Sequence, residues 1–71
     1  MQTRMRKSRP RRGELVHHKD SVDTNQQPNG IILLVNHEER SVTIKFYDSR
    51  LEDVEFDDME WTDKLGGVWF V

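Results

Sequence analysis

Two stretches of the chain have the spacing of β-strands. Residues 31–35 (IILLV) form the longest apolar run, and residues 41–47 (SVTIKFY) alternate strictly between apolar and polar positions. A polar turn, residues 36–40 (NHEER), lies between them. Alternation with a period of two beside a short β-branched run predicts two antiparallel strands and their turn. Since no other segment is as apolar, we expect the core to form here, with both faces of 31–35 covered.

Three more strands are expected, one before this hairpin and two after it. Leu15 and Val16 begin the first strand, and residues 68–71 (VWFV) form the last, because all four are strong β-formers. Between the first strand and the hairpin, residues 19–30 form a polar loop that ends in the turn signal Asn29-Gly30.

Residues 51–61 (LEDVEFDDMEW) admit two interpretations. A helix would place Leu51 and Val54 on one face, but Phe56 would point elsewhere. A strand that meets a bulge or short turn at Asp57-Asp58 accommodates all the apolar positions, and we favour it. The count is then five short strands and no helix. A closed or nearly closed small barrel would protect the edges of so short a sheet best.

The first three strands resemble those of SH3-like barrels of the KOW and Tudor-like type. The pattern is GELVHH at residues 13–18, NGIILLV at 29–35 and VTIKF at 42–46. The resemblance covers residues 13–47 well and the rest loosely. It implies a small five-stranded all-β barrel. Such modules often bind RNA, DNA or other proteins, and many belong to nucleic-acid machinery or to small phage-encoded proteins. A Tudor-like methyl-lysine cage is not carried over, because the sequence does not show where its aromatic residues converge.

The charge is distributed very unevenly along the 71 residues. Six of the eleven bases and none of the thirteen acids lie in residues 1–12, which leaves residues 13–71 with a net charge of −8. Residues 1–12 are also nearly free of apolar side chains, so we expect a disordered basic arm ahead of one small domain at 13–71.

The basic arm favours a non-enzymatic nucleic-acid-binding module. Arginine-rich segments neutralise phosphates without regard to sequence, and the barrel would serve as a platform. The predicted contacts are the arm cations and the outward side chains of the third strand: Arg4, Arg6, Lys7, Arg9, Arg11, Arg12, Lys45 and Tyr47.

The alternative is a protein-interaction adaptor or regulator that binds a basic partner. Its contact surface would be the acidic, tryptophan-bearing part of the chain: Glu55, Asp57, Asp58, Glu60, Trp61 and Trp69. A solvated acidic face without a partner, and tryptophans that simply pack, are the plainer interpretations of the same residues.

Other kinds of site find little support. There is no cysteine, no glycine-rich phosphate loop and no nucleophile motif around any serine, so we expect no enzyme, no metal and no cofactor. His17, His18 and His37 are expected to be surface histidines. The absence of disulfides and of a long apolar run favours a cytoplasmic protein without a membrane span. An uncapped edge at the C-terminal strand could pair with a second copy, so we expect a monomer or weak homodimer.

Overall fold

A computed structural model describes residues 9–18, 27–63 and 66–71, and these residues are all-β. The strands are β1 (Leu15–His17), β2 (Gly30–Asn36), β3 (Ser41–Phe46), β4 (Leu51–Glu55), β5 (Glu60–Thr62) and β6 (Val68–Phe70). The polar loop and the arm fall largely on residues 19–26 and 1–8, which lie outside the described residues. No helix among the described residues is long and apolar enough to cross a membrane.

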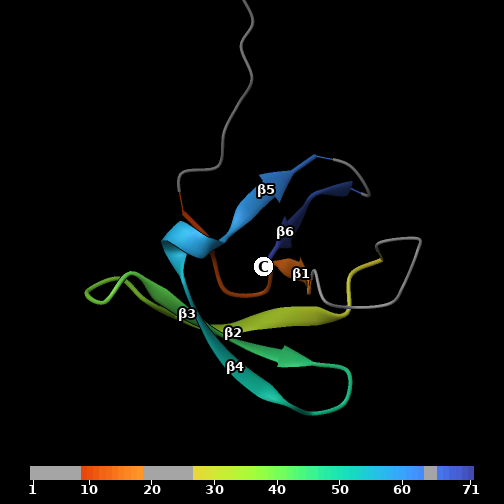
Figure 1. The fold of residues 1–71 in the computed structure, drawn as a ribbon, viewed down its shortest axis with the longest axis horizontal. Coiled ribbons are helices and arrows are strands. Elements are labelled where there is room, and N and C mark those ends of the chain that lie inside the picture. Colours follow the sequence, from red (N-terminus) through yellow and green to blue (C-terminus); the bar gives the residue numbers. More distant parts are fainter. Residues whose placement is uncertain (1–8, 19–26, 64–65) are drawn as a thin grey trace, which may run out of the picture.

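The six strands form one mixed sheet in the order β4-β3-β2-β1-β6-β5 (Figure 1). β1 and β6 are parallel, and every other neighbouring pair is antiparallel. The expectation of five strands in a closed barrel is not confirmed, because this sheet has six strands and is not closed. The extra strand arises where a 3₁₀ turn, η1 (Phe56–Asp58), divides residues 51–61 into β4 and β5. The preference for a strand and a turn over a helix is therefore confirmed.

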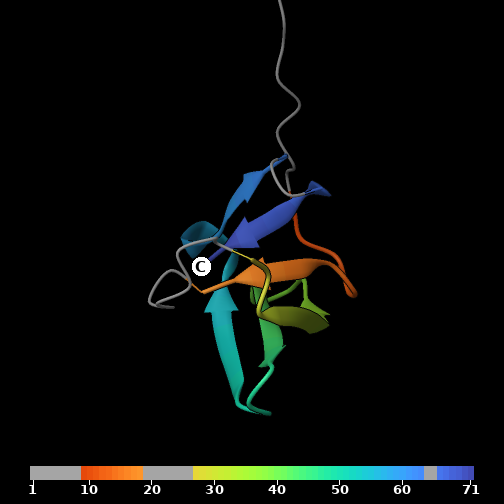
Figure 2. The same cartoon turned by 90° about the vertical axis from the view of Figure 1, so that its right-hand side faces the viewer.

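The open sheet curls around a single core. Figures 1 and 2 both place β4 and β5 at opposite ends of the molecule. Residues from both halves nevertheless pack together, because Val42, Ile44 and Phe46 of β3 share one cluster with Val16 of β1 and Trp69 of β6. Phe56, Met59 and Val71 complete the packing between the halves. Burial of these side chains supplies most of the favourable free energy that a domain of this size can gather.

The N-terminal segment joins this core earlier than the composition suggests. Pro10 is fully buried, although the arm was expected to extend to residue 12. One carboxylate oxygen of Glu14, Oε1, then accepts hydrogen bonds from the Arg11 backbone N–H at 2.8 Å and from the Trp69 indole Nε1 at 2.9 Å. These contacts attach the residues before β1 to β6, at the other end of the sequence.

A bulge in β2 overturns the expectation that both faces of residues 31–35 are covered. Ile32 lies opposite Ile44, but the next pair is Leu34 opposite Thr43, so Leu33 is the extra residue. Because facing alternates along a strand, this insertion turns Leu34 to the same side as Ile31. That side has no covering layer among the described residues, and Leu34 is 61% exposed.

Candidate interaction surfaces

The basic segment, residues 1–12, is described by the structure only from residue 9 onward. Arg9, Arg11 and Arg12 are described and exposed, whereas Arg4, Arg6 and Lys7 lie outside the described residues. The three visible arginines flank the buried Pro10, so their charged ends stand at the surface while the backbone between them is anchored. Such side chains can attract phosphate or carboxylate groups.

Lys45 and Tyr47 lie elsewhere, on the outward side of β3 and just beyond it. Tyr47 is 81% exposed. Lys45 forms no ion pair within the described part of the chain, unlike Arg40, which pairs with Asp57 at 3.5 Å, and Arg50, which reaches Asp48 at 4.0 Å. The neighbours of Lys45 in the sheet are apolar, so the predicted nucleic-acid contacts on β3 adjoin an apolar surface.

The acidic residues line an open groove of about 830 Å³ along β4, η1 and β5. Its walls carry six carboxylates, from Glu52, Asp53, Glu55, Asp57, Asp58 and Glu60. Apolar side chains of Val54, Met59, Phe70 and Val71 complete the lining, together with His18. The structure thus brings together the four acids predicted as a partner-binding surface. A groove of this charge attracts cationic groups and repels nucleic acid.

The two tryptophans predicted for that surface are not in the groove. Trp69 is buried, with 3% of its surface exposed, and Trp61 is half-buried against it at a ring-centroid distance of 5.3 Å. The Trp61 indole donates a hydrogen bond to Asp63 at 3.1 Å. Packing, the plainer interpretation of these residues, is therefore what Trp69 does.

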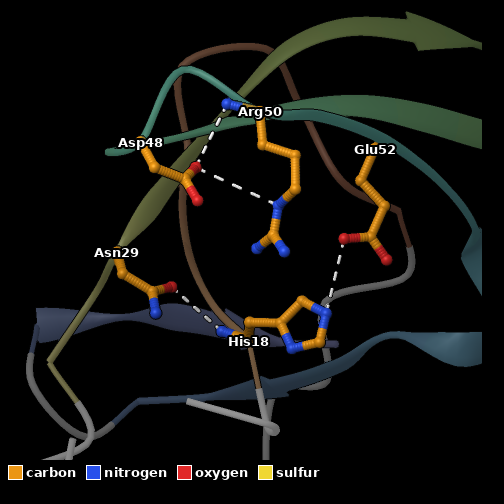
Figure 3. A network of polar contacts seen from close by, with 5 residues as sticks. All are labelled: His18, Asn29, Asp48, Arg50 and Glu52. Atoms are coloured by element: carbon orange, nitrogen blue, oxygen red, sulfur yellow. Dashed lines mark hydrogen bonds and ion pairs between the residues drawn. The ribbon is translucent and has the colours of Figure 1, made fainter. Parts of the chain in front are cut away.

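Polar side chains tie the ends of β1 and β4 together across the concave side of the sheet (Figure 3). The Nε2 atom of His18 lies 3.4 Å from a carboxylate oxygen of Glu52, and the His18 backbone N–H donates to Asn29 at 3.0 Å. Beneath them, the Phe46 ring meets the His18 ring edge-on at 5.4 Å and the Arg50 guanidinium at 4.9 Å. This cluster stabilises the curl of the sheet between β1 and β4, which are not neighbours in the sheet.

The neighbouring histidine is not at the surface. His17 is 3% exposed, its Nδ1 lies 2.8 Å from the carbonyl oxygen of Gln27, and its ring is 5.2 Å from that of Phe70. The expectation of a surface position is therefore wrong for His17. Adjacent residues of a strand face opposite ways, so His17 points away from the core side on which its neighbour Val16 lies, and it is covered there by Phe70 and the backbone of Gln27.

The convex side of the sheet carries the most unusual feature of the molecule, an exposed apolar row. Leu15 pairs with Ile31, Ile31 with Lys45, and Lys45 with Leu51, so these four residues cross β1 to β4 side by side. Leu15, Ile31 and Leu51 are 44%, 39% and 59% exposed. Leu33, Leu34 and Tyr47 are the other large exposed apolar side chains among the described residues. We call this side of β1–β4 the outer face.

A second row on the outer face is more polar and is hollowed. Leu34 pairs with Thr43 and Thr43 with Asp53, and the Thr43 hydroxyl donates a 2.8 Å hydrogen bond to Asp53. These three residues line a shallow depression of about 470 Å³, together with Glu38 and Glu39 of the β2–β3 turn and four further residues. The outer face thus presents an apolar row with one lysine beside a hollow with three carboxylates.

The outer face escaped prediction for a reason that the sequence shows only in part. Leu51 is out of phase with Val54 and Phe56, and this is a readable sign that it faces away from the core. For Leu34 no such sign exists, because the bulge that turns it outward depends on the pairing with β3.

The part of the chain that the structure describes contains no group of three or more metal-ligating side chains that could hold a metal ion. No family model, curated protein or solved structure matches this chain, so its function has to be inferred from the surfaces themselves.

Proposed function

We propose that the chain is a non-enzymatic protein-interaction module whose contact surface is the outer face. The observation that carries this proposal is the apolar row, in which Leu15, Ile31 and Leu51 remain exposed across four adjacent strands. Large contiguous apolar patches on the surface of a soluble protein usually mark interaction sites. An apolar centre with a polar rim is also the usual anatomy of a protein interface.

Charge favours a protein over a nucleic acid as the occupant of this face. Lys45 is the one cation within the row, and residues 13–71 carry a net charge of −8. A polyanion would gain one favourable contact there against the repulsion of the whole domain. A protein surface with apolar side chains around a carboxylate would match both the row and Lys45.

The proposal is tested by capture of partners with full-length protein carrying a photo-crosslinking residue in place of Tyr47, which is exposed beside the row. Crosslinks to protein should form in nuclease-treated extract of the cells that make this chain. They should disappear when Leu34→Glu places a charge in the middle of the outer face.

A matched control carries the crosslinker at Glu60, in the acidic groove. If crosslinking is equally efficient from Glu60 and Tyr47, or is unchanged by Leu34→Glu, the outer face is not the contact surface. Crosslinks that vanish on nuclease treatment would instead indicate that nucleic acid mediates the contact.

A second candidate function is nucleic-acid binding by the basic segment. What favours it is that Arg9, Arg11 and Arg12 are exposed at the start of the described residues and directly follow three further cations in the sequence. In this version, the affinity comes from the segment and falls steeply as salt rises.

Its test replaces charge and leaves the backbone intact, because deletion of residues 1–12 would also remove the buried Pro10. All six basic residues of the segment are changed to glutamine. Affinity for a DNA or RNA duplex in a salt titration should then be lost, and Lys45→Gln should have little effect. Equal binding by the glutamine variant would contradict this function.

We propose, further, that the fold is related to small SH3-like barrels. In support, β1–β4 form an antiparallel meander, and a C-terminal strand returns to β1. The His18–Glu52 contact also joins strands that backbone pairing leaves apart. An experimental structure whose strand order differs from β4-β3-β2-β1-β6 would place the chain outside that group.

A further inference from the structure

We propose that the partner of the outer face is a second copy of this chain, so that the protein forms a two-fold symmetric dimer by stacking its sheets. This inference rests on the proposed function and identifies its partner. It follows from the order of side chains on the outer face, which is complementary to itself when the strand direction is reversed.

The outer face has two parallel rows of opposite character. The first row, Leu15–Ile31–Lys45–Leu51, is apolar with one positive charge. The second row, Leu34–Thr43–Asp53, lines the hollow and is bordered by Glu38 and Glu39. An apolar row with one positive charge therefore runs beside a depression lined by carboxylates.

A two-fold axis that runs between the two rows, parallel to them, superposes each row on the other row of the second copy. Ile31 of one copy then faces Leu34 of the other, because both are on β2. Lys45 faces Thr43 of the other copy and lies beside its Asp53, which is on the adjacent strand. Isologous symmetry creates each of these contacts twice.

One pair of charges, Lys45 of each copy beside Asp53 of the other, supports this arrangement. Lys45 has no ion-pair partner within the described part of the chain, whereas Arg40 and Arg50 each have a carboxylate and an aromatic ring. The hydrogen bond from Thr43 holds the Asp53 carboxylate on the outer face. A two-fold axis that runs parallel to the strands would instead make the apolar row face itself, and Lys45 would then meet no carboxylate of the second row.

The inference is tested by sedimentation equilibrium of full-length protein from micromolar to millimolar concentration. We expect a dimer whose dissociation constant rises about a hundredfold in Lys45→Glu, because two symmetric charge pairs are lost at roughly tenfold each. Asp53→Lys alone should weaken the dimer as well. The double variant Lys45→Glu/Asp53→Lys should restore it, because the charges are exchanged.

Two controls keep the test independent of folding. Circular dichroism and amide NMR spectra of each variant report whether the sheet is intact, and Glu60→Gln in the acidic groove should leave the dissociation constant unchanged. A chain that stays monomeric throughout, or a dimer that is insensitive to Lys45→Glu, would overturn the inference. A monomer that still crosslinks to other proteins from Tyr47 would overturn the inference alone and leave the proposed function standing.

Discussion

At the scale of single residues, Gly30, the first residue of β2, leaves no room for a side chain. An alanine Cβ there would lie 2.7 Å from Cδ1 of Phe46 and 3.0 Å from Cγ2 of Ile44. Phe46 cannot retreat easily, because His18 and Arg50 pack on its ring. The sequence reads Asn29-Gly30 as a turn, but the glycine is needed for this close approach within the sheet.

Gly30→Ala is therefore expected to lower the free energy of unfolding by about 1–3 kcal/mol, the usual effect of overpacking a core. Urea denaturation followed by tryptophan fluorescence measures this difference. The same substitution in a Phe46→Leu background should have a smaller effect, since the clashing ring atoms are gone. An equal loss in both backgrounds would place the cause in the backbone rather than in contact with Phe46.

Glu14 is a second residue whose role is defined by its contacts. Its Oε1 receives the Trp69 indole N–H and the Arg11 backbone N–H, and Trp69 is buried. Glu14→Ala leaves the indole without this acceptor and should lower the free energy of unfolding by about 1.5–3 kcal/mol. Glu14→Gln retains a carbonyl oxygen and should lose less. Equal losses in the two variants, measured by urea denaturation, would show that the acceptor is not the stabilising feature.

At the scale of elements, the β2 bulge decides which apolar residues reach water. Leu33 is the unpaired residue between Ile32 and Leu34. If Leu33 is removed, all remaining residues of β2 still point to the same sides of the sheet as before. Deletion of Leu33 should therefore leave a folded protein with a loss of about 1 kcal/mol in the free energy of unfolding, as for an ordinary surface-proximal change.

Deletion of Thr43, on the facing strand, is the matched control. β3 has no extra residue, so this deletion reverses the facing of one half of the strand and turns either Val42 or Ile44 away from the core. We expect that variant not to fold, because the whole stability of a small domain is only about 5 kcal/mol. Dispersed amide NMR spectra for the Leu33 deletion and collapsed spectra for the Thr43 deletion are the expected pair. Collapsed spectra for the Leu33 deletion with dispersed spectra for the Thr43 deletion would mean that the bulge sets the register between β2 and β3.

The elements also show how far the sequence could predict this structure. Alternation placed the strand at residues 41–47 and favoured a turn at Asp57-Asp58, because both depend on local pattern. The parallel pairing of Val16 with Trp69 could not be anticipated, since it joins residues from opposite ends of the chain. The candidate surfaces divide in the same way. The acidic groove follows from a cluster in the sequence, whereas the outer face depends on pairing across four strands.

At the scale of the whole molecule, the acidic groove, the outer face and the exposed arginines lie at different places on the surface. The acidic groove occupies β4, η1 and β5, the outer face covers the convex side of β1–β4, and the exposed arginines precede β1. Gathering acidic residues along one groove raises the free energy of the folded state, because like charges repel at short range. Burial of Phe56 and Met59 in the adjoining core offsets part of this repulsion.

This separation predicts how stability depends on salt and on one charge. Glu60 is exposed at the groove, so Glu60→Gln should raise the free energy of unfolding by about 0.5 kcal/mol at low ionic strength, and Glu60→Lys should raise it further. In about 1 M salt, where the screening length falls to roughly 3 Å, the three proteins should become nearly equal. Urea titrations at both ionic strengths measure the differences. If both variants are less stable than the unmodified protein at low salt, the Glu60 carboxylate is stabilised by its surroundings, and the groove is not a site of net repulsion. If the free energy of unfolding at low salt instead increases from glutamate to glutamine to lysine at this position, the negative charge of the groove destabilises the folded chain. A cationic group bound in the groove would then relieve this repulsion.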